Sequence, residues 1–126
     1  MGKIIAIANQ KGGVGKTTTC VNLAASMAAT RRRVLVIDLD PQGNATMASG
    51  VDKYDAERTA YELLVDDMPA RDVIITETAG GYHLIAANAD VTAAEIRLLA
   101  FFARDIRLRN ALAPVRDDYD SIFIDC

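Results

Sequence analysis

Cysteine, histidine and long apolar runs are scarce in this chain of 126 residues. The two cysteines, Cys20 and Cys126, lie too far apart to indicate a disulfide framework or a zinc site, so we expect a reduced, cytoplasmic setting. The apolar run near the N-terminus is too short for a signal sequence or a membrane span, and Ala6 stands where a myristoylation signal needs Ser or Thr. No attachment to a membrane is therefore expected.

An excess of basic residues is also lacking. The net charge is -3, whereas surfaces that bind nucleic acid are usually basic, so composition alone indicates no such partner. Hydrophobic residues make up 51% of the chain and charged residues 25%, which excludes a disordered protein and favours one globular domain over residues 1–126.

Short continuous apolar segments are present, and they predict an α/β fold. Lys3–Ala8, Arg33–Asp38 and Ser121–Asp125 are typical of strands that are buried on both faces of a parallel sheet. Tyr82–Ala87 is a fourth candidate strand. The alanine-rich segment Thr17–Ala29 predicts a helix between the first two strands, which makes a βαβ unit.

Helix signals further along the chain favour the same fold class. Thr59–Glu62 and Thr92–Glu95 have the pattern of a capping box, in which a Thr hydroxyl accepts from a backbone N–H and a Glu reaches back. Another helix is expected over Asp105–Ala113, ending near Pro114. Strands and helices that alternate in this way predict an α/β doubly wound fold.

A glycine-rich segment, Lys11–Thr18 (KGGVGKTT), lies between the first strand and the first helix, which is the context of a phosphate-binding P-loop. Glycines let backbone N–H groups curl around phosphate oxygens, and the helix N-terminus adds partial positive charge. Lys16 suits the β- and γ-phosphates, and the Thr17 hydroxyl suits Mg²⁺. The first glycine of the generic motif is replaced by Gln10, and Lys11 follows it, which is a deviant form of the loop.

Aspartates stand at the ends of two other predicted strands. Asp38 and Asp40 end the second strand, and Asp125 ends the last one after Ile-Phe-Ile, which is the Walker B arrangement. In open α/β sheets ligands bind beyond the carboxyl ends of the strands, where a carboxylate can hold Mg²⁺ or orient an attacking water. Such residues also cap helices, but beside a phosphate loop the functional interpretation is favoured for all three.

Three segments carry a resemblance to a known family. Lys3–Thr19 (KIIAIANQKGGVGKTTT), Val34–Thr46 (VLVIDLDPQGNAT) and Asp118–Cys126 (DYDSIFIDC) resemble parts of ParA/Soj-type partition ATPases. The resemblance runs over essentially the whole chain. The sequence Asp-Pro-Gln-Gly-Asn favours the ParA branch over MinD, nitrogenase iron proteins and iron–sulfur scaffold ATPases.

The resemblance implies roles for the residues of the loop. Lys16 is similar to the Walker lysine, and Lys11 to the signature lysine that reaches the partner's nucleotide across an ATP-sandwich dimer. Thr17 would ligate Mg²⁺, and Thr18 would contact the α-phosphate. The nucleotide-binding residues implied are Lys11, Gly12, Gly13, Val14, Gly15, Lys16, Thr17 and Thr18.

The resemblance also implies roles for the carboxylates. Asp40 would position the hydrolytic water, while Asp38 and Asp125 would support the metal shell. The expected cofactors are ATP and Mg²⁺. The catalytic residues implied are Lys11, Lys16 and Asp40, and the metal-binding residues are Thr17, Asp38 and Asp125.

The activity that the resemblance implies is ATP hydrolysis coupled to a switch between monomer and dimer, used in chromosome or plasmid partition. Expected partners are a second copy of the chain, a ParB-type centromere-binding protein and DNA bound without sequence preference. The ATP-bound form is expected on the nucleoid. Family members are longer, so residues 1–126 are expected to be an N-terminal fragment that stops after the Walker B strand and lacks the DNA-binding part.

Three other interpretations stay open. A MinD-like, membrane-associated regulator of division needs an amphipathic C-terminal helix. An iron–sulfur carrier ATPase needs a C-x-x-C pair, which these residues lack. The third is a nucleotide-binding fragment without enzymatic activity.

Some structural expectations follow from the same motifs. The P-loop strand and the Walker B strand should be neighbours, because both point their carboxyl ends at one Mg²⁺–phosphate centre, and this places the last strand inside the sheet. A chain that ends there should leave the apolar side chains of Ile122 and Ile124 uncovered. We expect His83 and Cys20 to be structural, and Arg31–Arg33 to form a solvated turn after the first helix.

Overall fold

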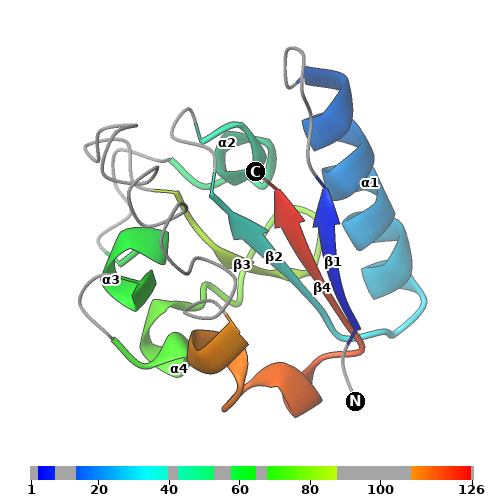
Figure 1. Cartoon of the computed structure of the whole chain (residues 1–126). Helices are drawn as coiled ribbons and strands as arrows, with labels where there is room; N and C mark the ends of the chain where they lie inside the picture. The colour runs from blue at the N-terminus through cyan, green and yellow to red at the C-terminus, as the bar shows by residue number, and fades with distance from the viewer. Residues whose placement is uncertain are drawn as a thin grey trace.

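The computed structural model describes residues 3–7, 14–39, 43–52, 58–64, 68–87 and 109–125. Within these residues, four strands form one parallel sheet in the order β1-β4-β2-β3. Figure 1 shows this sheet at the centre of the molecule, with β4 between β1 and β2. The strands are β1 (Lys3–Ile7), β2 (Val34–Asp38), β3 (His83–Ile85) and β4 (Ser121–Asp125).

The last of these strands in the chain, β4, lies in the interior of the sheet. Its first residue, Ser121, pairs with Lys3 of β1 on one side and with Val34 of β2 on the other. The prediction that the P-loop strand and the Walker B strand are neighbours is therefore confirmed. Strands form at all four predicted apolar segments, and Ser121–Asp125 has its predicted bounds.

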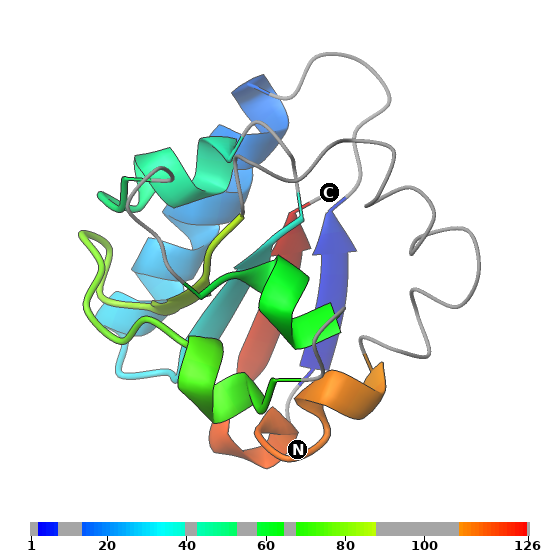
Figure 2. The same cartoon turned by 90° about the vertical axis from the view of Figure 1, so that its left-hand side faces the viewer.

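Helices cover both faces of the sheet. One face carries α1 (Val14–Ala29) and α2 (Asn44–Ala48). The other carries α3 (Ala60–Leu64), α4 (Ala70–Val73) and the segment around the 3₁₀ helix η1 (Arg116–Asp118). Figure 2 shows α3 and α4 in front of the sheet and α1 beyond it. The predicted α/β fold, with a parallel sheet covered on both faces, is confirmed.

The core consists of two apolar clusters, one on each face of the sheet. Successive side chains along β2 and β4 point to opposite faces, and all of them are buried. On the α1 face, Val36 and Phe123 pack with Cys20 and Tyr82. Cys20 is 0% exposed, so its predicted place in the core is confirmed.

The opposite face of the sheet differs from the sequence-based expectation. Ile122 and Ile124 are only 0% and 5% exposed, although both were expected to be uncovered. They belong to a cluster that also contains Leu63 of α3, Val73 of α4 and Leu112. The expectation was wrong because these segments return to the sheet and cover this face.

Both ends of α1 have informative geometry. The helix begins at Val14 rather than at Thr17, because the end of the glycine-rich segment already forms the first helical turn. At the other end, Arg31 has a φ of 66°, and the Arg32 N–H donates to the Met27 carbonyl at 3.2 Å. This is a Schellman-type C-terminus, in which glycine usually occupies the left-handed position. The predicted solvated turn at Arg31–Arg33 is confirmed by the exposure of all three side chains.

The capping box that was predicted for α3 is confirmed. The Thr59 hydroxyl oxygen accepts from the Tyr61 N–H at 3.3 Å, and Glu62 Oε2 accepts from the Thr59 N–H at 3.1 Å. The second predicted box, Thr92–Glu95, lies outside the described residues. Of the next predicted helix, residues 109–112 are helical and the earlier part is also outside them. Among the helices that are described, none is both long enough and apolar enough to cross a membrane.

Candidate functional site

The carboxyl ends of three strands meet at one edge of the sheet, which we call the carboxyl edge. Ile7, Asp125 and Asp38 end β1, β4 and β2, and Asp125 is the register partner of both other residues. Asp38 and Asp125 are each 0% exposed. The first residues of α1 lie toward the same edge (Figure 1). Two buried carboxylates therefore lie on adjacent strands, near the start of the helix that follows the glycine-rich segment.

The carboxylate of Asp38 is bound by Thr46 of α2. The Thr46 N–H and hydroxyl both donate to Asp38 Oδ2, at 2.8 Å and 2.7 Å. The hydroxyl oxygen of Thr46 also accepts from the Ala87 N–H at 3.0 Å. These hydrogen bonds connect the end of β2, the first turn of α2 and the segment that follows β3.

Asp38 also acts as a helix cap, which is the alternative that sequence reasoning gave for strand-terminal aspartates. The N-cap of α2 is Gly43, with φ 66° and no side-chain cap, so the Asp38 carboxylate provides the acceptor for an N–H of the first turn. Sequence reasoning missed Thr46. The available signal was a hydroxyl residue three positions after a glycine that follows a strand ending in aspartate. Participation of Asp38 in a metal shell stays a prediction.

The chemistry of the carboxyl edge fits a Mg²⁺ ion that arrives with a nucleotide. Adjacent buried carboxylates repel each other, and a nearby cation offsets this repulsion. Mg²⁺ prefers oxygen ligands and is commonly held by one or two carboxylates, phosphate oxygens and water. In the described part of the chain, no group of three or more His, Cys, Asp or Glu side chains is arranged to hold a metal.

The predicted phosphate loop is only partly described. Val14–Thr18 form the first residues of α1, and the first backbone N–H groups of a helix lack partners within it and attract anions. The roles of the loop side chains stay predictions, as does the role of Asp40 in orienting water. Outside the described residues lie Lys11, Gly12, Gly13 and Asp40.

His83 has a structural environment, as the sequence indicated. It lies at the start of β3, opposite Leu35, and therefore near the amino ends of the strands. His83 Nδ1 and the Tyr119 hydroxyl are 2.6 Å apart, and the two rings meet edge to face. Burial lowers the pKa of His83, while burial and the nearby Asp118 raise the pKa of Tyr119 to about 12. The imidazole and the tyrosine hydroxyl thus share a hydrogen bond in a partly buried environment.

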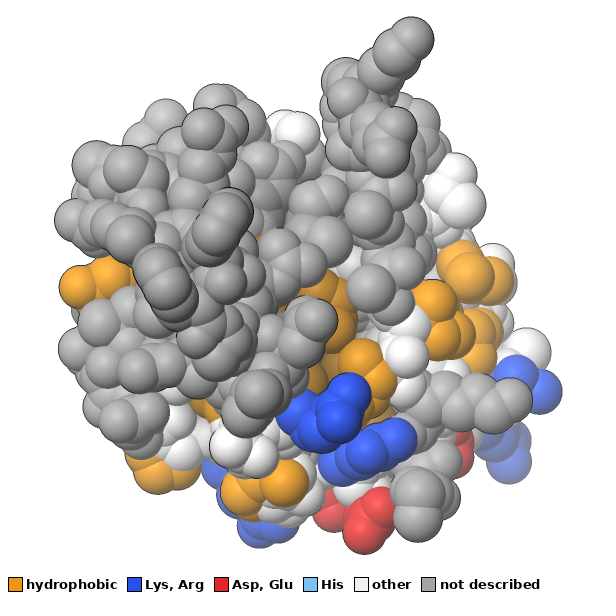
Figure 3. Space-filling view, viewed as in Figure 1, with side chains coloured by type: hydrophobic (Ala, Val, Ile, Leu, Met, Phe, Trp, Pro, Cys, Tyr) orange, Lys and Arg blue, Asp and Glu red, His pale blue; other side chains and the backbone are white. Residues whose placement is uncertain are grey.

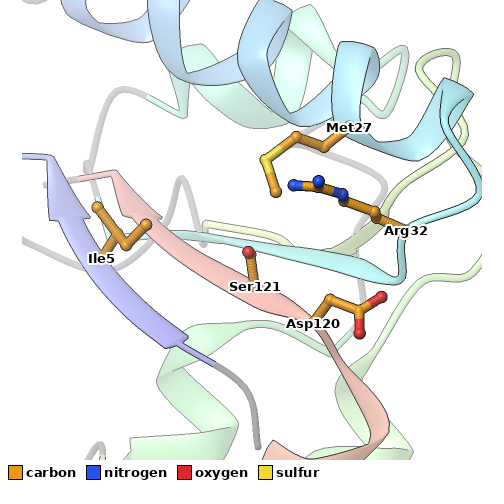
Figure 4. A pocket seen from close by; sticks show the side chains of 5 residues that line it. All are labelled: Ile5, Met27, Arg32, Asp120 and Ser121. Carbon is orange, nitrogen blue, oxygen red and sulfur yellow. The ribbon is translucent and has the colours of Figure 1, made fainter.

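A shallow pocket of about 480 Å³ lies away from the carboxyl edge. It is bounded by the end of α1, the middle of β1 and the start of β4, as Figure 4 shows. In the space-filling view, orange apolar side chains are exposed near the centre of the molecule, and blue Lys and Arg side chains lie directly below them (Figure 3). Ile5 of β1 is 40% exposed. The pocket is lined by Ile5, Met27, Arg32, Asp120 and Ser121.

A parallel α/β sheet with buried aspartates at its carboxyl edge, and a glycine-rich segment between its first strand and first helix, defines the class of P-loop NTPases. The chain belongs to the AAA-domain family, whose model matches residues 2–126.

Proteins of similar sequence include partition proteins. An uncharacterised protein of Pseudomonas putida is 61% identical over 126 residues, which are 100% of this chain and 48% of that protein. The sporulation initiation inhibitor protein Soj of Bacillus subtilis is 51% identical over 100% of this chain and 50% of its own length. The chromosome partitioning protein ParA of Myxococcus xanthus is 45% identical over 100% of this chain and 44% of its own length. The chain thus spans about half the length of the curated relatives it matches, and its predicted resemblance to ParA/Soj proteins is confirmed.

Solved structures give the same fold. Cobyrinic acid a,c-diamide synthase from Mycobacterium smegmatis, with a bound ATP analogue and magnesium, matches with a TM-score of 0.88 and 39% identity over 100% of this chain and 51% of that one. The cell division ATPase MinD of Pyrococcus furiosus matches with a TM-score of 0.77 and 30% identity, over 100% of this chain and 50% of that one. The pNOB8 ParA bound to nonspecific DNA matches with a TM-score of 0.72 and 33% identity, over 99% of this chain and 46% of that one.

Proposed function

We propose that residues 1–126 are the nucleotide-binding domain of a Mg²⁺-dependent ATPase that acts in chromosome or plasmid partition. The observation that carries this proposal is the burial of Asp38 and Asp125 on adjacent strands, at the edge where α1 begins. Burying a carboxylate costs several kcal/mol unless it is compensated, so a pair of this kind is more typical of a functional site than of a structural one.

The phosphates are bound by residues of the loop and the start of α1. Lys16 supplies the positive charge at the β- and γ-phosphates, and the backbone N–H groups of Val14–Thr18 surround them. Thr18 contacts the α-phosphate. The Thr17 hydroxyl is a ligand of Mg²⁺, which when bound neutralises charge on the phosphate oxygens.

Hydrolysis uses the carboxylates and a second copy of the protein. Asp38 and Asp125 orient water molecules of the metal shell, and Asp40 orients the water that attacks the γ-phosphate. Lys11 reaches the nucleotide of the partner copy and stabilises the charge that develops there, as an arginine finger does. ATP binding therefore favours a dimer, and hydrolysis returns it to monomers.

The relatives support partition over the other activities in the same structural class. Sequence identity is 51% with Soj and 45% with the Myxococcus ParA, against 39% with the diamide synthase and 30% with MinD. The ParA of pNOB8 has been solved on nonspecific DNA, which supports DNA as a partner here. We place DNA binding in the part of the protein that this chain does not span, and we propose a ParB-type partner and a cytoplasmic, nucleoid-associated protein.

The first test is ATP binding by the intact protein and its Lys16→Ala variant. Calorimetry should show that Lys16→Ala lowers ATP affinity by about 100-fold, because a charged hydrogen bond contributes about 1.5–3 kcal/mol. The control is Arg71→Ala, which removes a positive charge whose side chain is 67% exposed and paired with Asp118, and should bind ATP like the parent protein. Unchanged affinity in Lys16→Ala would contradict the P-loop assignment.

The second test separates partition from the open alternatives. ATP turnover by the intact protein should rise on addition of nonspecific DNA together with a ParB-type protein. Turnover that responds to anionic vesicles instead would favour the MinD-like regulator. ATP binding without turnover under either condition would favour a nonenzymatic nucleotide-binding protein.

A further inference from the structure

Thr46 carries a buried hydroxyl to which the proposed mechanism gives no task. The residue is 0% exposed. Its hydroxyl oxygen accepts from the Ala87 N–H at 3.0 Å, and its hydrogen is directed to Asp38 Oδ2 at 2.7 Å. An N–H can only donate and a carboxylate can only accept, so the direction of both hydrogen bonds is fixed. The hydroxyl therefore holds one carboxylate oxygen in a defined place.

Leu39, just after β2, and Thr46 of α2 are both attached to the carboxyl edge. The Leu39 N–H donates to the Asp125 carbonyl at 2.9 Å, which attaches this residue to β4. Thr46 attaches α2 to Asp38 through both the N–H and the hydroxyl. Hydrogen bonds to the carboxyl edge thus hold the described residues Leu39 and Thr46 in place.

We infer that Thr46 is a positioning residue of the Mg²⁺–nucleotide site, which orients the Asp38 carboxylate toward the water shell of the metal. The inference rests on the proposed ATPase function. Partners that orient the groups around a metal typically change metal affinity or activity by about 10–100-fold when they are removed. A hydroxyl that only stabilised α2 would change the unfolding temperature and leave Mg²⁺ binding as it was.

Ser49, at the C-cap of the same helix, is a matched control. It is also 0% exposed. Its hydroxyl donates to the Ala45 carbonyl at 2.7 Å and shares a hydrogen bond with the Tyr82 hydroxyl. Ser49→Ala therefore removes a buried hydroxyl at the end of α2 whose hydrogen bonds go to Ala45 and Tyr82.

The experiment compares Thr46→Val, Thr46→Ser and Ser49→Ala with the parent protein, all as the intact protein. A non-hydrolysable ATP analogue is bound first without metal, and Mg²⁺ is then titrated while binding and the unfolding temperature are followed. Thr46→Val should bind the metal-free analogue within about twofold of the parent, but should need about tenfold more Mg²⁺ for half-maximal stabilisation. ATP turnover should fall by a similar factor.

The controls make the inference falsifiable. Thr46→Ser, which keeps the hydroxyl, should restore the parental Mg²⁺ dependence, and Ser49→Ala should lower the unfolding temperature without changing that dependence. Parental Mg²⁺ dependence in Thr46→Val, equal losses in Thr46→Ser, or an equal shift in Ser49→Ala would each overturn the inference. If Thr46→Val lacks a cooperative unfolding transition, Thr46→Ala takes its place under the same criteria. A parent protein that binds no Mg²⁺–nucleotide would instead contradict the proposed function.

Discussion

Charged side chains are buried at the carboxyl edge of the sheet and exposed at the opposite end, where the strands begin and which we call the amino edge. At the carboxyl edge, Asp38 and Asp125 are fully buried on adjacent strands. At the amino edge, Asp120 is exposed and accepts from the Arg33 N–H at 2.7 Å, a hydrogen bond that lowers the pKa of its carboxyl group. Its ion pair with the Arg33 side chain, at 3.6 Å, has both side chains largely in water.

The difference in burial between the two edges indicates which edge has a function beyond stability. An exposed ion pair costs little free energy to form and contributes little to stability, so the charges at the amino edge need no functional explanation. Buried carboxylates are unfavourable unless something compensates for them. The carboxyl edge is therefore the end of the sheet at which changes should affect activity, and the amino edge is the end at which they should affect only stability.

The largest expected effect comes from a pair of substitutions, one at each edge. Asp125→Asn should lower ATP turnover of the intact protein by about 100-fold or more, because the uncharged amide cannot support the metal shell. Asp120→Asn should leave turnover at the parental rate and change the unfolding temperature only slightly. Steady-state hydrolysis and thermal unfolding of both variants are the measurements. Similar turnover in the two would remove the distinction between the edges.

The tyrosine at the amino edge should contribute to stability alone. Tyr119→Phe removes the hydroxyl that shares a hydrogen bond with His83 and should destabilise the protein by about 1 kcal/mol at neutral pH. The pKa of Tyr119 is raised from 10.0 to about 12 in the folded protein, so its contribution is present below pH 10 and is lost as the pH rises toward 12. Denaturant unfolding from pH 7 to 11 should show a smaller alkaline loss in Tyr119→Phe, and altered ATP turnover at neutral pH would count against a purely structural role.

A smaller change of opposite sign is expected at the end of α1. Arg31 occupies a left-handed conformation that favours glycine, so Arg31→Gly should stabilise the protein by about 0.5–1 kcal/mol. Arg32→Gly, at the next residue, is the control and should give no such gain. Thermal unfolding of both variants tests this, and a loss of stability in Arg31→Gly would show that the side chain contributes more than the backbone strain costs.

The smallest effect is expected from His83. Burial lowers its pKa below the ordinary value of 6.5, so the unfolded chain binds this proton more readily than the folded protein. Stability from this group is complete above pH 6.5 and decreases as the pH falls below it. In His83→Gln, unfolding measured between pH 7 and 5 should show a shallower decrease than in the parent protein, and identical curves would contradict the assigned environment.

The sequence was informative where a pattern is local or continuous. The apolar runs ending in Asp38 and Asp125 predicted two central strands, and the glycine-rich segment between β1 and α1 indicated a P-loop. The capping box at Thr59 was readable because its contacts lie within one turn. Contacts between residues far apart in the sequence could not be predicted from it. Thr46 has its role only because β2 and β3 bring Asp38 and Ala87 to it.

The prediction from sequence failed for the same reason on the face of the sheet that α3 and α4 cover. Ile122 and Ile124 were expected to be uncovered because the chain ends directly after their strand, yet both are buried. The covering side chains, such as Leu63 and Val73, come from short helices whose direction of packing is decided by tertiary contacts. Local patterns therefore located the candidate site, while its supporting contacts needed the fold.

The strand order has a consequence for how the protein is made. β1 and β2 are not neighbours, since β4 lies between them, so these two strands cannot pair with each other although both are made before β4. β1 can join the sheet only after Ser121–Asp125 emerges, and at about 5–20 residues per second the delay lasts several seconds. During that time the edges of β1 and β2 are open to wrong pairing. Newborn chains of this kind are thus expected to depend on chaperones that shield strands until translation has passed β4.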